Sequence, residues 1–285
     1  QQGQAAEDGR APRARLTLRP ERRLIRPSGS FRHIDFQIDV EHSPRNDRRP
    51  PVSIAIVIDR SGSMSGDKIQ TAKQAALAVI DRLDERDTAT VVVFDDQVDV
   101  VHPAGPVTTE FKSRVRAELQ RIDARASTDL HRGWLTGCQE IASDQPQLRS
   151  GRLARCFLLT DGQANQGVTD PEQIATDAAG VWQNAGITTS TFGIGDYDES
   201  VLGPMAVAGG GQFHHLRTSR EIATTFVGEL AGLFDVAVSR VTLEIEADAG
   251  IEREIVSQYH SRALGASRWS IGIGDLIGGE QRHVV

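Results

Sequence analysis

Hydrophobic and polar positions along the chain follow two different patterns. Residues Ile34 to Val40 alternate apolar and polar side chains, which is the period of a β-strand with one buried face. After residue 50 continuous apolar runs appear instead, and the first of them, Ile54 to Ile58, is typical of a parallel strand covered on both faces. The change of pattern predicts that a second structural unit begins near residue 50.

The middle of the chain alternates strand-like and helix-like segments. Further strands are predicted at Ala89–Phe94, Cys156–Thr160 and Ile187–Phe192, with a shorter one at Gln212–His215, and apolar stripes at helical spacing lie between them. One helix start is well marked, because Asp170 stands where a cap is needed and Pro171 follows it. This alternation predicts an α/β fold with a doubly wound, mainly parallel sheet over residues 50–235.

The two ends of the chain resemble each other more than they resemble the middle. Val241–Glu246 and Trp269–Ile273 return to period-two alternation, and no helical stripe separates them. We therefore expect a small β domain built from residues 14–49 and 236–285, flanking an inserted α/β domain. Residues 1–13 are polar and are predicted to be disordered, and residues 41–50 are predicted to form a linker.

Composition excludes some classes of function. The formal net charge of −7 argues against a surface that binds nucleic acids or anionic membranes in general. The sequence contains no run of 18 apolar residues, so no membrane-spanning helix is predicted. The two cysteines, Cys138 and Cys156, are expected to be buried thiols rather than a disulfide or a metal pair. The chain begins at Gln1 rather than Met, which suggests a fragment or a processed product. The missing signal region therefore leaves the compartment open, with the cytoplasm favoured over secretion or the periplasm.

Oxygen-bearing side chains follow the predicted strands. Asp59, Ser61 and Ser63 come directly after the first buried strand, Asp161 follows the Cys156 strand, and Thr128 precedes a helical stripe. Ligands of open parallel sheets bind at the carboxyl ends of the strands, so these five side chains are expected to meet at one edge of the sheet. We call them the five-residue site.

The chemistry of these side chains points to a hard cation. Ligation by oxygen alone, without Cys or His, suits Mg²⁺, with Mn²⁺ or Ca²⁺ as alternatives, rather than zinc. The two carboxylates can neutralise the charge of a divalent ion but cannot exceed it. Mg²⁺ prefers six ligands, which is more than these five side chains supply. A vacant coordination position on such an ion would attract an acidic group from a partner, and we expect that partner to be a protein offering a Glu or Asp carboxylate.

The motif resembles that of the von Willebrand factor type A domain, whose metal-ion-dependent adhesion site follows Asp-x-Ser-x-Ser, a distant Thr and a distant Asp. Here Asp59, Ser61, Ser63, Thr128 and Asp161 match all five positions, and the resemblance covers about residues 50 to 235. It implies a Rossmann-like fold in which the serine hydroxyls bind the ion directly. It also implies that the Thr and the second Asp exchange direct and water-mediated roles as the domain opens and closes.

The flanks carry a second resemblance. The strands around Gly274-Asp275-Leu276 and Gly279-Glu280 are similar to those of bacterial relatives of the calcium-activated chloride channel regulators, in which a β domain accompanies the A domain. One departure from the family pattern is Ser127, where Gly is common before the Thr. Arg60 and Met64, inside the first loop, are expected as contacts on the rim of the site.

Other polar residues near the strand ends have structural interpretations. Asp129 and His131 could touch a partner, but a solvated helix start is favoured for them. Asp95 and Asp96 could form a second ion site, but a simple turn is favoured. The adjacent pair His214-His215 points to opposite faces of a strand and cannot bind one ion together, so both are expected to be structural.

Enzyme signatures are missing from the sequence. A phosphatase of the haloacid dehalogenase type needs a second Asp where Ser61 stands, and no nucleophile elbow or phosphate loop is present. We therefore expect a binding protein rather than an enzyme, acting as a metal-dependent adhesion or scaffold module. An adaptor subunit of an AAA-type (MoxR-like) ATPase is the alternative, and a metal-dependent hydrolase is a remote one.

Overall fold

A computed structural model describes residues 14–21, 33–41, 51–125, 127–143, 152–216, 219–248, 254–257, 259, 261–265 and 267–285. These residues form two compact units, one of residues 50–234 and one that combines the N-terminal and C-terminal flanks. The predicted disorder of residues 1–13 and nearly all of the predicted linker at 41–50 lie outside the described residues.

The α/β unit is built on a six-stranded sheet with the order β5-β4-β3-β6-β7-β8. Neighbouring strands are parallel throughout, except that β4 and β5 form an antiparallel pair at one edge. This arrangement confirms the predicted doubly wound, mainly parallel sheet. The strands are β3 (Val52–Asp59), β4 (Thr88–Phe94), β5 (Val98–Pro106), β6 (Leu153–Thr160), β7 (Ile187–Ile194) and β8 (Gly210–Leu216).

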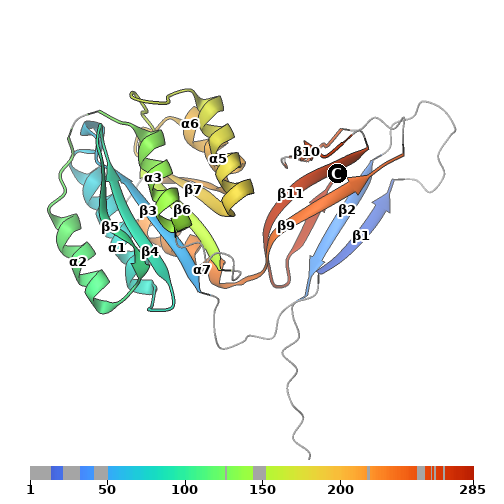
Figure 1. Ribbon diagram of the computed structural model, residues 1–285, viewed down its shortest axis with the longest axis horizontal. Coiled ribbons are helices and arrows are strands. Elements are labelled where there is room, and N and C mark those ends of the chain that lie inside the picture. The colour runs from blue at the N-terminus through green and yellow to red at the C-terminus, as the bar shows by residue number, and fades with distance from the viewer. Residues whose placement is uncertain are drawn as a thin grey trace, which may run out of the picture. The chain divides into compact units, whose positions relative to one another are not determined.

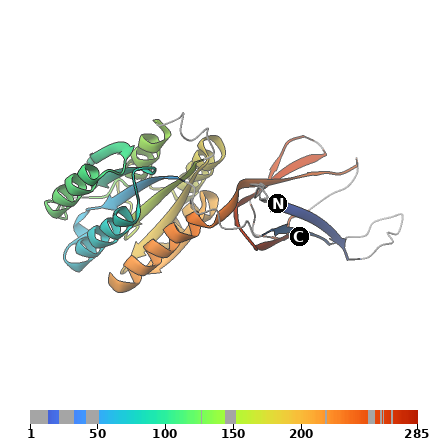
Figure 2. The same ribbon diagram turned by 90° about the horizontal axis from the view of Figure 1, so that it is seen from below.

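Helices cover both faces of this sheet. Helices α3, α5 and α6 lie on one face and α1 and α7 on the other, while α2 packs beside α1 and β5 (Figures 1 and 2). Every residue of β3, β4, β6 and β7 is buried, because helices exclude water from both sides of these central strands. The helices are α1 (Asp67–Arg82), α2 (Thr109–Gln120), α3 (Leu130–Ser143), α5 (Pro171–Ala185), α6 (Glu199–Ala208) and α7 (Ser219–Phe234), with a short 3-10 turn at Gly62–Met64.

The predicted start of α5 is confirmed. The Asp170 side chain accepts a hydrogen bond from the Glu172 amide, and Pro171 occupies the first helical turn. Strand β5 was not predicted, because it is an edge strand whose alternation is broken by Pro103 and a glycine, and only part of it is shielded. None of the described helices is both long and apolar enough to cross a membrane.

The β unit consists of two small antiparallel sheets with strand orders β1-β2-β12 and β10-β11-β9. Side chains from both sheets share one apolar core that includes Ile38, Leu243, Ile271 and Val284. The period-two alternation therefore places one face of each sheet against the other. The strands are β1 (Ala14–Pro20), β2 (Ile34–Val40), β9 (Val236–Glu246), β10 (Ser261–Ala263), β11 (Arg268–Ile277) and β12 (Gln281–Val284).

A buried ionic cluster fastens α7 to the sheet. The Glu229 carboxylate of α7 pairs with the Arg155 guanidinium of β6, accepts a hydrogen bond from Ser190 Oγ at 2.8 Å, and lies 2.9 Å from His214 Nε2. Burial alone would raise the pKa of Glu229, but the His214 hydrogen bond and the Arg155 charge outweigh it and lower the pKa to about 2. Glu229 is therefore ionised inside the fold.

Candidate functional site

The central strands β3 and β6 end side by side at the point where the chain reverses its direction of winding, since β4 lies beyond β3 and β7 lies beyond β6 (Figure 1). Asp59 is the last residue of β3 and Thr160 is the last residue of β6. Thr160 Oγ1 donates a 2.6 Å hydrogen bond to Asp59 Oδ2 and accepts one from the Gly162 amide at 2.8 Å. Such a switch point is where ligands bind in open α/β sheets.

The loop after β3 brings two serine hydroxyls beside Asp59. The Ser61 amide donates to Asp59 Oδ1 at 2.7 Å, and the Oγ atoms of Ser61 and Ser63 lie 3.1 Å apart. The Met64 amide closes the turn by donating to the Ser61 carbonyl at 3.0 Å. Asp59 and Ser61 are buried whereas Ser63 is exposed, so this cluster of oxygens reaches the surface through Ser63.

Asp161, directly after β6, has one carboxylate oxygen without a partner. Its Oδ2 lies 3.3 Å from Lys68 Nζ, whereas its buried Oδ1 accepts no hydrogen bond from the described residues. An unsatisfied buried oxygen of this kind costs about 1–3 kcal/mol, so it marks a place where a ligand would stabilise the fold. Gly162 follows with a φ of +72°, and a Cβ there would lie 3.1 Å from Leu202 Cγ.

The two carboxyl groups repel each other. Burial, with a smaller contribution from the charge of Asp161, raises the pKa of Asp59 to about 6, because the hydrogen bonds from Thr160 and Ser61 only partly compensate. Because the folded state holds this proton more tightly than the unfolded state, Asp59 contributes to stability at low pH. That contribution is lost as the pH rises through about 6. At neutral pH a cation beside Asp59 would offset the repulsion.

Thr128 is joined to the Asp161 loop through its backbone. Its amide donates to Asn165 Oδ1 at 2.8 Å, and its carbonyl accepts from the amides of Asn165 and Gln166 at 3.2 and 3.1 Å. Thr128 is also buried. The side chains of Asp59, Ser61 and Ser63 thus lie together. The charge of Asp161 acts on Asp59, and the Thr128 backbone is hydrogen-bonded to the loop after Asp161. Ligation of an ion by these side chains remains a prediction.

Asp95 links two of these loops, a role that sequence analysis missed. Its fully buried Oδ2 lies 3.0 Å from Arg60 Nε and 2.7 Å from Arg125 Nε. The Asp95 carbonyl accepts the Asp129 amide at 2.8 Å, and the Arg60 carbonyl accepts the Arg125 amide at 2.8 Å. Burial alone would raise the pKa of Asp95, but hydrogen bonds from the Gln97 amide and both guanidinium groups lower it. Asp95 therefore holds the Ser61 loop against the Thr128 loop.

Replacing Asp95 with Asn is expected to weaken Mg²⁺ binding by about 10- to 100-fold, the usual cost of losing a group that orients metal ligands. The substitution keeps the shape of the side chain but removes the charge that holds Arg60 and Arg125 together. Isothermal titration calorimetry with Mg²⁺ measures the effect. Asp99→Asn is the matched control, because Asp99 meets Arg60 at 2.6 Å from a largely exposed position and should matter little. Equal Mg²⁺ affinity in Asp95→Asn and wild type would contradict a linking role for Asp95.

Arg60, Met64 and Asp95 lie beside the five-residue site and carried predictions from the sequence. Arg60 and Met64 are buried rather than on the rim, since the Arg60 guanidinium turns inward to Asp95 and the Met64 side chain enters the core, so that expectation was wrong. The turn at Asp95 is confirmed by the hydrogen bond from its amide to the Gln97 carbonyl at 2.9 Å. The prediction of a turn at Asp95 is therefore correct, although it did not include the contact between Asp95 and Arg60.

Other polar side chains near the strand ends make structural contacts, although His131 is mostly buried and not solvated as predicted. Asp129 Oδ1 accepts the Arg132 amide at the start of α3, and His131 Nε2 lies 2.8 Å from an Asp177 carboxylate oxygen. His214 stacks on Phe192 and meets Glu229 on one face of β8, whereas His215 packs against Tyr197. Both cysteines are free and buried, as predicted.

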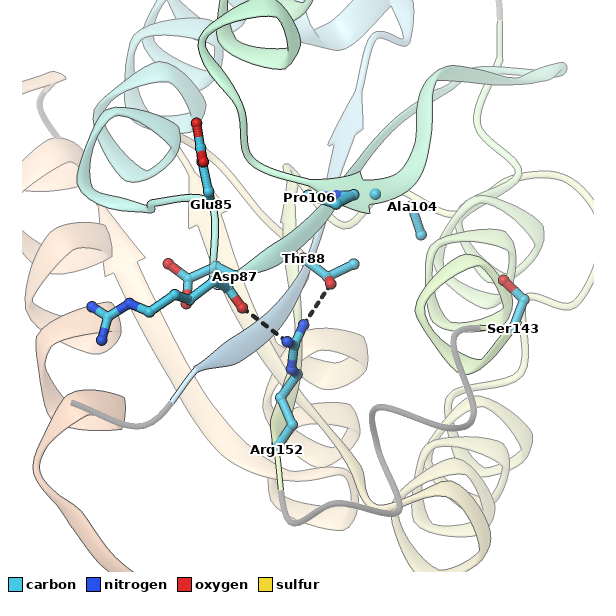
Figure 3. A pocket seen from close by; sticks show the side chains of 9 residues that line it. Glu85, Asp87, Thr88, Ala104, Pro106, Ser143 and Arg152 are labelled. Carbon is cyan, nitrogen blue, oxygen red and sulfur yellow. Dashed lines mark hydrogen bonds between the residues drawn. The ribbon is translucent and has the colours of Figure 1, made fainter. Parts of the chain in front are cut away.

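A pocket of about 460 Å³ lies where β4 begins and β5 ends, which is the end of the sheet opposite the five-residue site (Figure 3). Arg152 crosses it, donating to Thr88 Oγ1 at 2.5 Å and to the Arg86 carbonyl at 2.8 Å. The Asp87 carboxylate is engaged by the Val52 amide at 3.0 Å. These contacts join the beginnings of the strands, so the pocket is separate from the carboxyl-end site and has a structural explanation.

The donor set of the five-residue site fits a hard cation. It offers two carboxylates and three hydroxyls, and one carboxylate oxygen, Asp161 Oδ1, is buried and unpaired. Among the described residues no three His, Cys, Asp or Glu side chains come together as a metal site. An ion held here would therefore depend on Ser and Thr oxygens for much of its coordination.

Comparison with known proteins identifies the family. Residues 53–227, more than half of the chain, match the family model of the von Willebrand factor type A domain. The chain belongs to this family. Its members typically mediate protein interactions and commonly bind a divalent cation at a metal-ion-dependent adhesion site.

Curated relatives of this von Willebrand factor type A protein are considerably longer. An uncharacterized protein of Synechocystis, sll0103, is 30% identical over 202 residues, which span 70% of this chain and 46% of the relative. The uncharacterized Escherichia coli protein YfbK is 26% identical over 87% of this chain and 43% of its own length. Human inter-alpha-trypsin inhibitor heavy chain H4 is 27% identical over 75% of this chain and 23% of its own. The chain thus spans less than half of each of these proteins.

Solved structures agree on the fold. A von Willebrand factor type A protein from Catenulispora acidiphila superposes with a TM-score of 0.73 at 20% identity, covering 98% of this chain and 66% of that one. The pilus adhesin SpaC of Lactobacillus rhamnosus GG, in its open conformation, gives a TM-score of 0.56 at 12% identity, covering 98% of this chain and 43% of the adhesin. At such identities these likenesses concern the fold alone.

Proposed function

We propose that this protein is a metal-dependent protein-binding module of the adhesion or scaffold type. Asp59, Ser61, Ser63, Thr128 and Asp161 would hold one divalent cation, most simply Mg²⁺. The ion would capture a Glu or Asp carboxylate of a partner protein through a coordination position that the chain leaves open. The protein is then a binding protein rather than an enzyme.

The observation that carries the proposal is the state of the two acidic residues. Asp161 Oδ1 is buried without a hydrogen-bond partner, and Asp59 is buried close enough for its pKa to be raised by the Asp161 charge. Both features cost free energy at neutral pH, and a cation between the loops would relieve both. A site maintained at such a cost favours a ligand over a purely structural role for these residues.

The open position follows from the supply of oxygens. Asp59 already accepts hydrogen bonds on both carboxylate oxygens, from the Ser61 amide and the Thr160 hydroxyl, so its contribution to an ion is restricted. The hydroxyls of Ser61, Ser63 and Thr128 are neutral ligands. Mg²⁺ seeks six oxygens and keeps water where the protein supplies fewer, and a carboxylate of a partner can displace such a water.

Capture of a partner should require both the ion and the serine hydroxyls. When the chain is immobilised in Mg²⁺ and exposed to an extract of cells of its own source, we expect partner proteins to bind and then to elute with EDTA. The Ser63→Ala variant should retain far less of these proteins. Ser63 is exposed and its replacement leaves the core unchanged. Acetate at high concentration should compete with the bound partner, because it offers the same carboxylate. Retention that EDTA, acetate and Ser63→Ala all leave unchanged would contradict the mechanism.

The capture experiment tests the adaptor alternative, and a turnover assay tests the hydrolase alternative. Copurification of an AAA-type (MoxR-like) ATPase would favour the adaptor function. A metal-dependent hydrolase would instead require turnover of a phosphoester or peptide that disappears in Asp59→Ala.

A further inference from the structure

Lys68 reaches from helix α1 to the carboxylate that follows β6. Its Nζ atom lies 3.3 Å from Asp161 Oδ2, although the two residues are 93 positions apart in the sequence. The Asp161 side chain is fully buried and that of Lys68 is 29% exposed. The ammonium group therefore pairs with Oδ2 of the carboxylate, whereas the buried Oδ1 has no hydrogen-bond partner among the described residues.

The end of β7 makes room for the Lys68 stem. Gly195 has a φ of +71°, and a Cβ built there would lie 2.8 Å from Lys68 Cε. Any other residue would adopt a strained backbone conformation and would require the end of the Lys68 side chain to shift. The Gly195 amide is bonded to the Leu216 carbonyl at 3.3 Å, which fixes this glycine against β8. The glycine thus leaves space for the Lys68 side chain on its way to Asp161.

We propose that Lys68 sets the electrostatic balance of the five-residue site: it weakens binding of the cation and strengthens binding of the partner's carboxylate to that cation. This inference rests on the proposed function. Lys68 is a positioning and specificity residue here, since it acts through Asp161 and through its charge.

The count of charges gives the physical reason. The formal charges of Asp59, Asp161 and Lys68 sum to one net negative charge, and a divalent cation turns this into one net positive charge. Arg60 is directed to Asp95 and Asp99, and Arg125 to Asp95, so these two cations are paired with other carboxylates. A single carboxylate from a partner then brings the site to neutrality. Without Lys68 the two aspartates alone would neutralise the ion, and its attraction for a further anion would fall.

Lys68 also competes with the ion directly. Before the ion binds, the ammonium group is the only positive partner that the described residues offer to Asp161. A cation that draws on this carboxylate must share it with Lys68 or displace it. Removing the ammonium should therefore destabilise the ion-free protein and make ion binding more favourable, whereas a structural substitution would only do the former.

The test uses Lys68→Met, which keeps the stem, and Lys68→Arg, which keeps the charge, in the full chain. Mg²⁺ binding, measured by isothermal titration calorimetry, is expected to tighten about five- to tenfold in Lys68→Met and to stay near wild type in Lys68→Arg, as for a partly exposed charge. Lys68→Gln, which keeps a hydrogen-bond donor without the charge, should follow Lys68→Met.

The second half of the test uses acetate as the carboxylate probe. In protein loaded with Mn²⁺, acetate should displace ion-bound water and lower the water proton relaxation rate. Acetate should bind about five- to tenfold more weakly in Lys68→Met than in wild type. The two affinities thus change in opposite directions, which a loss of packing or of fold does not produce.

The outcomes distinguish this inference from the proposed function. If wild type binds neither Mg²⁺ nor Mn²⁺, the proposed function fails. If wild type binds the ion and acetate but both affinities in Lys68→Met are unchanged, or both fall together, the role assigned to Lys68 is overturned and the site itself stands.

Discussion

Mg²⁺ at one hundred times its dissociation constant is expected to stabilise the protein by about 2.7 kcal/mol, and Asp161→Asn is expected to abolish that stabilisation. For an α/β unit of this size the gain corresponds to a rise of about 5–10 °C in the melting temperature. The reason is local, since the ion would satisfy the buried Asp161 Oδ1 and offset the repulsion between Asp161 and Asp59. Thermal melting in Mg²⁺ and in EDTA at pH 7 measures the difference.

The effect of Mg²⁺ on the melting temperature should shrink as the pH falls toward 5. Burial and the Asp161 charge raise the pKa of Asp59 to about 6, so below that pH a proton occupies the carboxyl group and competes with the ion. The matched control is Asp81→Asn, which removes an exposed carboxylate of α1 paired with Arg116 and should leave the Mg²⁺ response intact. Identical melting of wild type in Mg²⁺ and EDTA at pH 7 would count against an ion at this site.

Those features of the site that depend on strand ends could be predicted from the sequence. Continuous apolar runs identified β3 and β6, and parallel strands bring their carboxyl ends to one edge, so Asp59 and the Asp161 loop were expected at the same edge. The pairing of β3 directly with β6 is known only from the structure. The alternating Asp59, Ser61 and Ser63 could be read in the same way, because they lie within five residues. The fold class followed from the alternation of periods, and the family comparison supports it.

Other features depend on side chains that meet only in the folded chain. Asp95 joins Arg60 across 35 positions and Lys68 joins Asp161 across 93, and no local period signals either contact. The sequence indicated Thr160 only as the residue before Asp161. Its role was not predicted, because the hydrogen bond from its hydroxyl to Asp59 Oδ2 forms only in the folded chain. Charged residues next to a strand end are usually interpreted as turn or surface residues, so the direction in which Arg60 points could not be decided without coordinates.

Glu229→Gln is expected to destabilise the α/β unit by about 3–5 kcal/mol, the largest loss of stability predicted for a single substitution here. The change preserves the size of the side chain but removes the Glu229 charge that pairs with the buried Arg155 guanidinium. It also weakens the contacts from Ser190 and His214, which hold β7 and β8 to α7. Urea denaturation at pH 7, followed by circular dichroism, measures the change. Glu118→Gln is the control, since its exposed pair with Arg121 should contribute at most about 1 kcal/mol.

The pH dependence of this difference tests its electrostatic origin. Because the folded state lowers the pKa of Glu229 from 4.5 to about 2, its contribution is fully present above about 4.5 and is lost as the pH falls through about 2. The gap between wild type and Glu229→Gln should therefore narrow below pH 4. Replacing both Arg155 and Glu229 with Met should recover part of the lost stability, because the penalty in the single variant comes from a buried guanidinium that has lost the Glu229 carboxylate. A double variant less stable than Glu229→Gln would instead assign the stability to packing around α7.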